Sequence, residues 1–98
     1  MITAYTLAGC RTCKELLSRL NSTSLPYRNI DVEANEELAD NLENLLNTSI
    51  YPIVQIAKPT LDIYFTSEKS DHYYFDNTKI IFVYSGVAHL IDLIKRNL

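Results

Sequence analysis

Two cysteines stand three positions apart near the start of the chain, in the stretch Cys10-Arg11-Thr12-Cys13, and no other cysteine occurs among the 98 residues. They lie between an apolar, β-prone stretch, residues 2–7, and a run that begins at Cys13 and repeats its apolar residues at helical spacing. A Cys-x-x-Cys pair at a strand-to-helix turn is typical of thiol–disulfide exchange. The sequence therefore predicts a redox-active pair that alternates between dithiol and disulfide.

The two thiols are expected to differ in role. Only a thiolate attacks a disulfide, so one of the two must ionise readily. Cys10 is expected at the N-terminus of the helix, where unpaired backbone N–H groups and the helix dipole favour negative charge, and Arg11 and Lys14 add positive charge nearby. We predict that Cys10 is the nucleophile and that Cys13 resolves the mixed disulfide. A structural or incidental pair is the alternative.

Metal binding is the rival chemistry for these thiols. Two cysteines with His72 and His89 supply ligand types that zinc accepts. The histidines are seventeen positions apart, far from the short His-x₃₋₅-His spacing of a zinc finger. No metal is therefore expected.

Composition and charge narrow the class of protein. A chain of 98 residues that is 47% hydrophobic predicts one globular domain over residues 1–98. A net charge of −3 without a basic face gives no indication of nucleic-acid binding. The N-terminus lacks a basic region followed by a long apolar run, and no apolar stretch reaches membrane-spanning length. We expect a cytoplasmic protein with no membrane partner, in which paired cysteines favour catalysis over a structural bridge.

Hydrophobic periodicity predicts the elements that position the pair. Helices are expected at about 10–21, 35–47 and 87–96, and strands at 2–7, 27–32, 51–56, 61–65, 72–75 and 79–84. Asn35 is the expected N-cap of the second helix, whose apolar stripe is predicted to contain Leu38, Leu42, Leu45 and Leu46. Lys95 and Arg96 lie in the last turn of the third helix, where the helix dipole favours positive charge. The β-α-β opening requires a parallel pair of strands with a right-handed crossover, whereas the closing strands and helix suggest an antiparallel half. The predicted fold is α/β, a mixed central sheet flanked by α-helices.

Two further patterns have two interpretations each. Six of the twelve acidic residues lie between Arg28 and Lys58, where no Lys or Arg occurs: Asp31, Glu33, Glu36, Glu37, Asp40 and Glu43. They form either a solvated helix face or an acidic docking surface. Seven of the ten aromatic residues fall between Tyr64 and Tyr84, and they either cover one side of the sheet or form a recognition surface.

This order of elements, with Cys-x-x-Cys after the first strand and Pro52 opening the third, resembles the thioredoxin fold. The short chain is similar to a glutaredoxin over about residues 1–56 and 79–97, with an inserted segment at about 57–78. The family's usual site is Cys-Pro-Tyr-Cys. The resemblance implies a redox-active dithiol and a cis bond between Tyr51 and Pro52, in which the Tyr51 backbone pairs with an extended substrate.

The resemblance also implies a glutathione site. Its predicted members are Arg11, Thr12, Tyr51, Pro52, Ser85 and Gly86. The free N–H groups at Ser85 and Gly86 would bind a carboxylate; the alternative is a plain N-cap at Ser85 with a tight turn. The family places an acid at the start of this last helix, where the present chain has Ala88, and often a lysine shortly before the first cysteine, where Leu7-Ala8-Gly9 stands.

The expected function is a thiol–disulfide oxidoreductase that reduces protein or glutathione-mixed disulfides, with glutathione as electron donor and the chain as a monomer. One alternative is a thioredoxin-like enzyme recharged by a reductase. Another is a non-catalytic module on a thioredoxin fold that grips a partner with the aromatic segment 64–84. A shared iron–sulfur cluster, known among glutaredoxin relatives, is not expected here.

Overall fold

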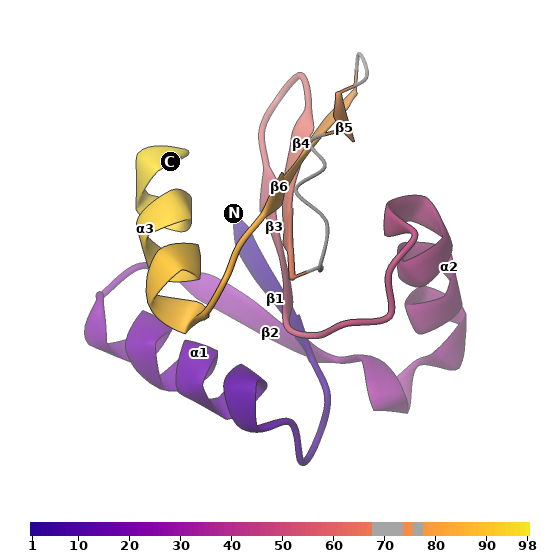
Figure 1. Ribbon diagram of the computed structural model, residues 1–98, viewed down its shortest axis with the longest axis horizontal. Helices are drawn as coiled ribbons and strands as arrows, with labels where there is room; N and C mark the ends of the chain where they lie inside the picture. Colours follow the sequence, from indigo (N-terminus) through magenta and orange to yellow (C-terminus); the bar gives the residue numbers. More distant parts are fainter. Residues whose placement is uncertain (68–73, 76–77) are drawn as a thin grey trace.

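The chain folds around one mixed β-sheet with helices on both faces (Figure 1). The computed structural model describes residues 1–67, 74–75 and 78–98. Its elements are, in order, β1 (Ile2–Thr6), α1 (Arg11–Ser22), β2 (Tyr27–Asp31), the 3-10 helix η1 (Val32–Ala34), α2 (Glu36–Leu46), β3 (Ile53–Ala57), β4 (Asp62–Thr66), β5 (Tyr74–Phe75), β6 (Lys79–Val83) and α3 (Val87–Arg96). The α/β class predicted from the sequence is confirmed, and η1 is an element that the periodicity did not predict.

The strand order is β2-β1-β3-β4-β6-β5. The β1–β2 pair is parallel, as the β-α-β opening required, and β3 runs antiparallel to both β1 and β4. The expectation of an antiparallel half was only partly right: β6 lies antiparallel to β5 but parallel to β4. The two strands in the middle of the sheet are therefore β3 and β4, and β1 is an interior strand between β2 and β3.

The two faces of the sheet have separate cores. Helices α1 and α3 cover one face, where Leu16 and Leu20 of α1 and Leu90 and Ile94 of α3 are fully buried against Phe65. Helix α2 and η1 cover the other face (Figure 1), which contains Tyr5, Cys13, Val32, Leu42, Leu46, Tyr51, Ile53, Tyr64 and Ile81. Cys13 therefore belongs to the core between the sheet and α2, although it lies on α1.

The helices begin and end largely where the sequence predicts. The side chain of Asn35 accepts a hydrogen bond from the backbone N–H of Leu38 at 3.1 Å, which confirms Asn35 as the N-cap of α2. Leu45, expected in the apolar stripe of α2, is 43% exposed, so this expectation was wrong. Successive residues of a helix are rotated by about 100°, which centres the buried face of α2 on Leu42 and Leu46. Ala39, which is partly buried, lies on this face in place of Leu45.

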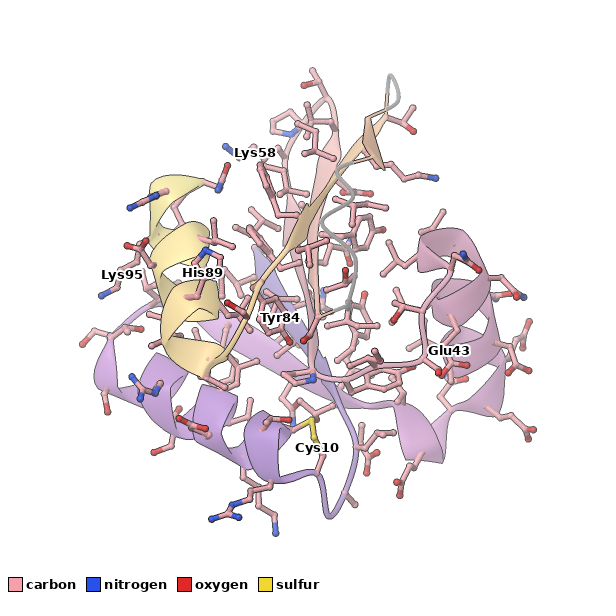
Figure 2. The ribbon with its side chains drawn as sticks, in the orientation of Figure 1. Cys10, Glu43, Lys58, Tyr84, His89 and Lys95 are labelled. Atoms are coloured by element: carbon pink, nitrogen blue, oxygen red, sulfur yellow. A yellow bond between two sulfur atoms is a disulfide. The ribbon has the colours of Figure 1, made fainter. Side chains whose placement is uncertain are left out.

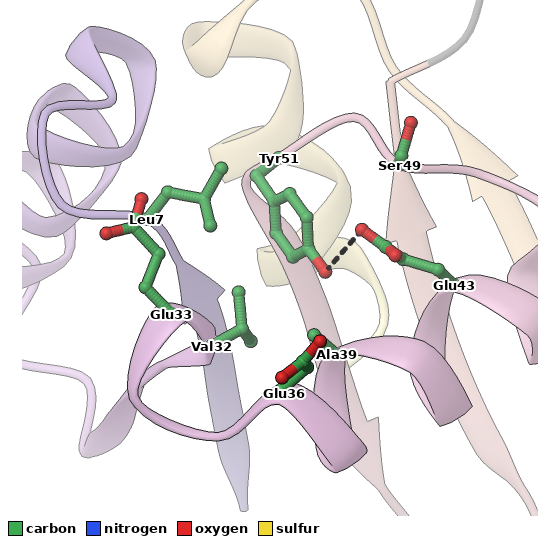
Figure 3. Close-up of a pocket in the computed structure, with 8 residues that line it drawn as sticks. All are labelled: Leu7, Val32, Glu33, Glu36, Ala39, Glu43, Ser49 and Tyr51. Atoms are coloured by element: carbon green, nitrogen blue, oxygen red, sulfur yellow. Dashed lines mark hydrogen bonds between the residues drawn. The ribbon is translucent and has the colours of Figure 1, made fainter.

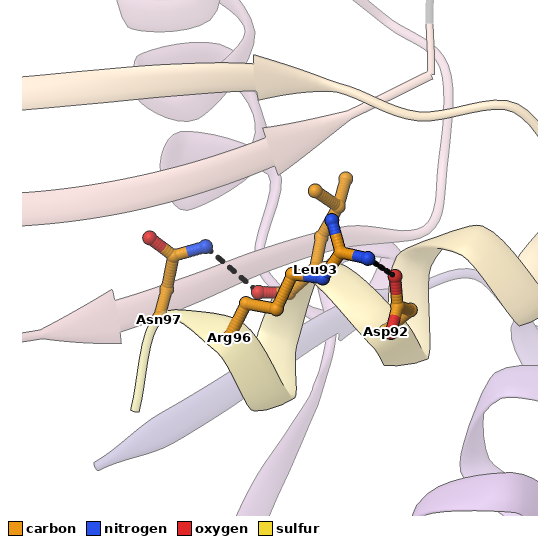
Figure 4. A network of polar contacts seen from close by, with 4 residues as sticks. All are labelled: Asp92, Leu93, Arg96 and Asn97. Carbon is orange, nitrogen blue, oxygen red and sulfur yellow. Dashed lines mark hydrogen bonds and ion pairs between the residues drawn. The ribbon is translucent and has the colours of Figure 1, made fainter.

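Helix α3 ends in a small polar network (Figure 4). The Arg96 guanidinium lies 3.0 Å from the Asp92 carboxylate, and the side chain of Asn97 donates a 2.8 Å hydrogen bond to the carbonyl of Leu93. Basic residues in this last turn suit the helix dipole, as expected from Lys95 and Arg96.

The segment between β3 and β6 contains two strands in its described part. The strand predicted at 61–65 is confirmed as β4, and the strand predicted at 72–75 is confirmed at β5, with residues 72 and 73 lying outside the described residues. Phe65 is fully buried and stacks on Phe82 with ring centroids 5.6 Å apart. Tyr64, Phe65, Phe82 and Tyr84 thus pack in the hydrophobic cores on the sheet, while Tyr73 lies outside the described residues.

No helix in the described ranges has the length and apolar character needed to cross a membrane.

Candidate active site

Cys10 and Cys13 are joined by a disulfide across the first turn of α1, with their Cα atoms 5.2 Å apart. Cys10 is the N-cap residue of this helix, and its sulfur accepts a hydrogen bond from the backbone N–H of Cys13 at 3.1 Å. Figure 2 shows its sulfur at the N-terminal end of α1. Cys13 is 1% exposed, whereas Cys10 is only partly buried. Of the two cysteines, Cys10 is therefore the more accessible to solvent.

The turn before the pair fixes its position at the end of β1. Gly9 has a φ of +76°, a conformation that favours glycine over residues with a Cβ. The backbone N–H of Cys10 then donates to the carbonyl of Leu7 at 3.3 Å. This short connection fixes Cys10 close to the end of β1. Arg11 and Thr12 are exposed at the helix start, and the Thr12 hydroxyl lies 3.4 Å from the Cys10 sulfur.

The Tyr51–Pro52 peptide bond is cis, as the resemblance implies. Tyr51 packs in the same hydrophobic cluster as Cys10 and Cys13. No hydrogen bond within the described part of the chain involves its backbone N–H or C=O. The structure thus brings Cys10, Cys13 and Tyr51 together. The backbone N–H and C=O of Tyr51 are groups with which a substrate can form hydrogen bonds.

Tyr84, which the sequence did not single out, holds the carbonyl of Pro52. Its hydroxyl donates a 2.6 Å hydrogen bond to that carbonyl, and both residues are buried. Burial raises the pKa of Tyr84 above its ordinary value, so the hydroxyl keeps its proton for this bond. A buried Tyr needs a hydrogen-bond partner for its hydroxyl. The position of Tyr84 directly before the Ser-Gly break is the sequence feature that could have pointed to this contact.

A groove of about 320 Å³ lies beside this site (Figure 3). Its described lining consists of Leu7, Val32, Glu33, Glu36, Ala39, Glu43, Ser49 and Tyr51. The Tyr51 hydroxyl points toward Glu43 and donates to its carboxylate at 3.2 Å. Burial and the neighbouring Glu43 carboxylate raise the pKa of Tyr51 to about 12. The sequence indicated only that this region is acidic. That three of its glutamates line one groove follows from the fold.

The predicted carboxylate site at Ser85 and Gly86 is partly occupied by the protein itself. The backbone N–H of Ser85 donates to Nδ1 of His89 at 3.1 Å. Gly86 is the N-cap of α3 with a φ of +81°, and no side chain caps the helix there. Tyr84 connects this turn to Pro52, so the strand-to-helix turn is held near the cis-proline loop. The carboxylate-binding role of Ser85 and Gly86 stays a prediction.

No group of three or more His, Cys, Asp or Glu suited to a metal ion occurs within residues 1–67, 74–75 and 78–98. His72, which the zinc alternative requires, lies outside these ranges.

The sheet order, the flanking helices and the Cys pair at the N-terminus of α1 define an α/β, thioredoxin-like fold. The glutaredoxin family model matches residues 2–58, more than half of the chain, so the chain belongs to the glutaredoxin family. It is 33% identical over 57 residues to N-acetyl-S-hydroxy-L-cysteine reductase of Bacillus subtilis (strain 168), covering 58% of this chain and 61% of that protein. It is 32% identical over 53 residues to the Gene 56 protein of Mycobacterium phage L5, covering 54% and 52% of the two chains.

The chain thus spans between half and two thirds of the length of these curated relatives. The family and the adjacent cysteines support a thiol oxidoreductase.

Proposed function

We propose that this chain is a thiol–disulfide oxidoreductase that reduces protein or glutathione-mixed disulfides through Cys10 and Cys13, with glutathione as its electron donor. The observation that carries the proposal is the Cys10–Cys13 disulfide at the start of α1, with one sulfur accessible and the other buried. Residues 1–98 act as one domain and as a monomer in this proposal. The site lies in a cytoplasmic setting, since a catalytic pair has to be kept reduced.

The reaction proceeds by two exchange steps. The Cys10 thiolate attacks one sulfur of the substrate disulfide, forms a mixed disulfide with it and expels the other sulfur as a thiolate. The Cys13 thiolate then attacks the Cys10 sulfur, expels the second substrate thiolate and leaves the Cys10–Cys13 disulfide. Two glutathione molecules reduce this disulfide and leave as glutathione disulfide. Two electrons pass from glutathione to the substrate in each cycle.

Three features support the roles assigned to the protein groups. Backbone N–H groups at the N-terminus of α1 stabilise negative charge on the Cys10 sulfur, which already accepts one such bond from Cys13. The Tyr51 backbone N–H and C=O pair with an extended substrate, held in place by Pro52 and Tyr84. Arg11 and Thr12 flank the accessible sulfur. Ser85 and Gly86 bind a carboxylate of glutathione through the N-terminus of α3.

The test couples reduction of a neutral mixed disulfide first to glutathione and then, in parallel, to a thioredoxin reductase. Activity with glutathione supports the proposal, and activity with the reductase alone supports the thioredoxin-like alternative. Cys10→Ser is expected to abolish both activities, whereas Ser18→Ala, on the exposed side of α1, provides the matched control. Retained activity in Cys10→Ser would refute the assignment of the nucleophile. Inactivity of the unmodified chain in both assays would favour the binding module.

A second candidate is reduction of a small oxidised thiol. The Bacillus subtilis relative carries the name N-acetyl-S-hydroxy-L-cysteine reductase. A dithiol can perform this reaction, because attack of Cys10 on an S-hydroxy sulfur releases water and attack of Cys13 then releases the thiol. The same coupled assay with an S-hydroxy thiol tests this candidate.

A further inference from the structure

The groove beside the disulfide combines an apolar floor with a carboxylate rim. Leu7 and Tyr51, which line it, pack in the hydrophobic cluster that also contains the two cysteines. The Leu7 carbonyl accepts the hydrogen bond from the Cys10 backbone, so the groove begins one short turn from the accessible sulfur. Any polypeptide that presents its disulfide to Cys10 therefore places neighbouring residues at this groove.

The charge of the groove has one sign. Glu33, Glu36 and Glu43 supply three carboxylates, and none of the described lining residues is Lys or Arg. In the part of the chain that the structure describes, no cation lies within ion-pair distance of these three groups. The sequence explains this absence, because no Lys or Arg occurs between Arg28 and Lys58. The Glu43 carboxylate also helps to raise the pKa of Tyr51, which is consistent with negative potential in the groove.

We propose that this groove selects substrates, and that it takes the side chain of a Lys or Arg close to the substrate's cysteine. The apolar floor formed by Leu7, Val32 and Ala39 suits the methylene stem of such a side chain, and the glutamates suit its charged end. A volume of about 320 Å³ is at the small end of binding sites, which fits one side chain rather than a folded surface. The occupant is a basic polypeptide segment next to a disulfide, and this inference rests on the proposed function.

The experiment uses the full chain, reduced beforehand, so that no electron donor is required. Its substrates are three short peptides whose single cysteine carries a neutral 2-mercaptoethanol disulfide, and which differ only in one residue near that cysteine. That residue is Lys, norleucine or Glu, and the set of three peptides is made again for each neighbouring position tested. Norleucine keeps the stem without the charge. The second-order rate of peptide release is measured by chromatography.

At the position where the effect is largest, we expect the Lys peptide to react about tenfold faster than the Glu peptide, and the norleucine peptide to react at an intermediate rate. The ratio is modest because each solvent-exposed charge pair contributes little free energy. The triple variant Glu33→Gln/Glu36→Gln/Glu43→Gln is expected to reduce this ratio to about twofold or less. Glu37→Gln removes one charge from the same helix without lining the groove, and should leave the ratio unchanged. The preference should also weaken as salt is added.

The outcomes separate the two proposals. Equal rates for the Lys and Glu peptides, or a preference that survives in the triple variant, overturn the role of the groove while the thiol chemistry stands. Failure to reduce any of the three peptides overturns the proposed function, and the inference with it.

Discussion

The hydrogen bond from Tyr84 to Pro52 is the polar contact whose loss we expect to cost most. Tyr84 is 4% exposed and Pro52 is fully buried, so water cannot replace the hydroxyl in Tyr84→Phe. The ring keeps its packing, and the substitution therefore isolates the bond. An acceptor left buried without a donor costs about 1–3 kcal/mol. We take about 2 kcal/mol as the expected loss, which for a domain of this size lowers Tm by roughly 10 °C.

Tyr27→Phe is the matched control for this substitution. The Tyr27 hydroxyl also donates a 2.6 Å hydrogen bond, to the side chain of Asn21, but this bond is exposed to water. Its loss should cost less than about 0.5 kcal/mol, because a solvated partner regains its hydrogen bond from water. The two variants therefore share the chemical change and the bond length, and differ in burial.

The assay is thermal and urea unfolding followed by far-UV circular dichroism, with the Cys10–Cys13 pair kept in one redox state throughout. The chain has no Trp, so backbone signal is preferable to fluorescence. If Tyr84→Phe loses no more stability than Tyr27→Phe, burial does not govern the strength of this bond and the reasoning fails.

Three further outcomes are expected. Cys13→Ser should accumulate a mixed disulfide between Cys10 and the substrate, detected by mass spectrometry, because no second thiol remains to release it; rapid turnover would contradict the resolving role. Burial, followed by Asp62 and Tyr5, raises the pKa of Tyr64 from 10.0 to about 12, so stability should be full below about pH 10 and decline as pH rises toward 12. Urea unfolding should show a shallower decline in Tyr64→Phe than in the unmodified chain, and equal slopes would exclude this residue as a cause. His89→Ala frees the N–H of Ser85 for a carboxylate and should lower the KM for glutathione roughly threefold, with the rate at saturation unchanged; an unaltered KM would argue against binding at that turn.

Much of the fold could be predicted because its signals are local. The spacing of Leu16 and Leu20 specified the buried face of α1, and Asn35 marked the start of α2 by a short-range hydrogen bond. The Cys pair was predicted for the same reason, since its spacing and the turn before it are read within a few residues. Leu45 was placed wrongly because the width of the buried arc depends on the neighbouring sheet, which the sequence does not display.

The parts that escaped prediction depend on contacts between distant segments. Tyr84 and Pro52 are 32 positions apart, and only the fold brings the hydroxyl to the carbonyl. The parallel pairing of β6 with β4 likewise joins segments that are distant in the sequence, where the local pattern indicated only strands and not their partners. The groove beside Tyr51 joins residues from three separate segments, so its charge was visible in the sequence but its location was not.

Thiol chemistry and substrate choice depend on different parts of this molecule. The chemistry requires the Cys pair and the backbone of α1, which carry the family's pattern. In the proposed function recognition depends on side chains as well as backbone, and here the sequence differs from the pattern that the family resemblance implies: Ala88 stands where the family places an acid, and His89 accepts the bond from Ser85. In the role proposed for the groove, its glutamates repel the carboxylates of glutathione and attract basic segments. We therefore expect substitutions at the groove to change which disulfide reacts and to leave the exchange steps intact.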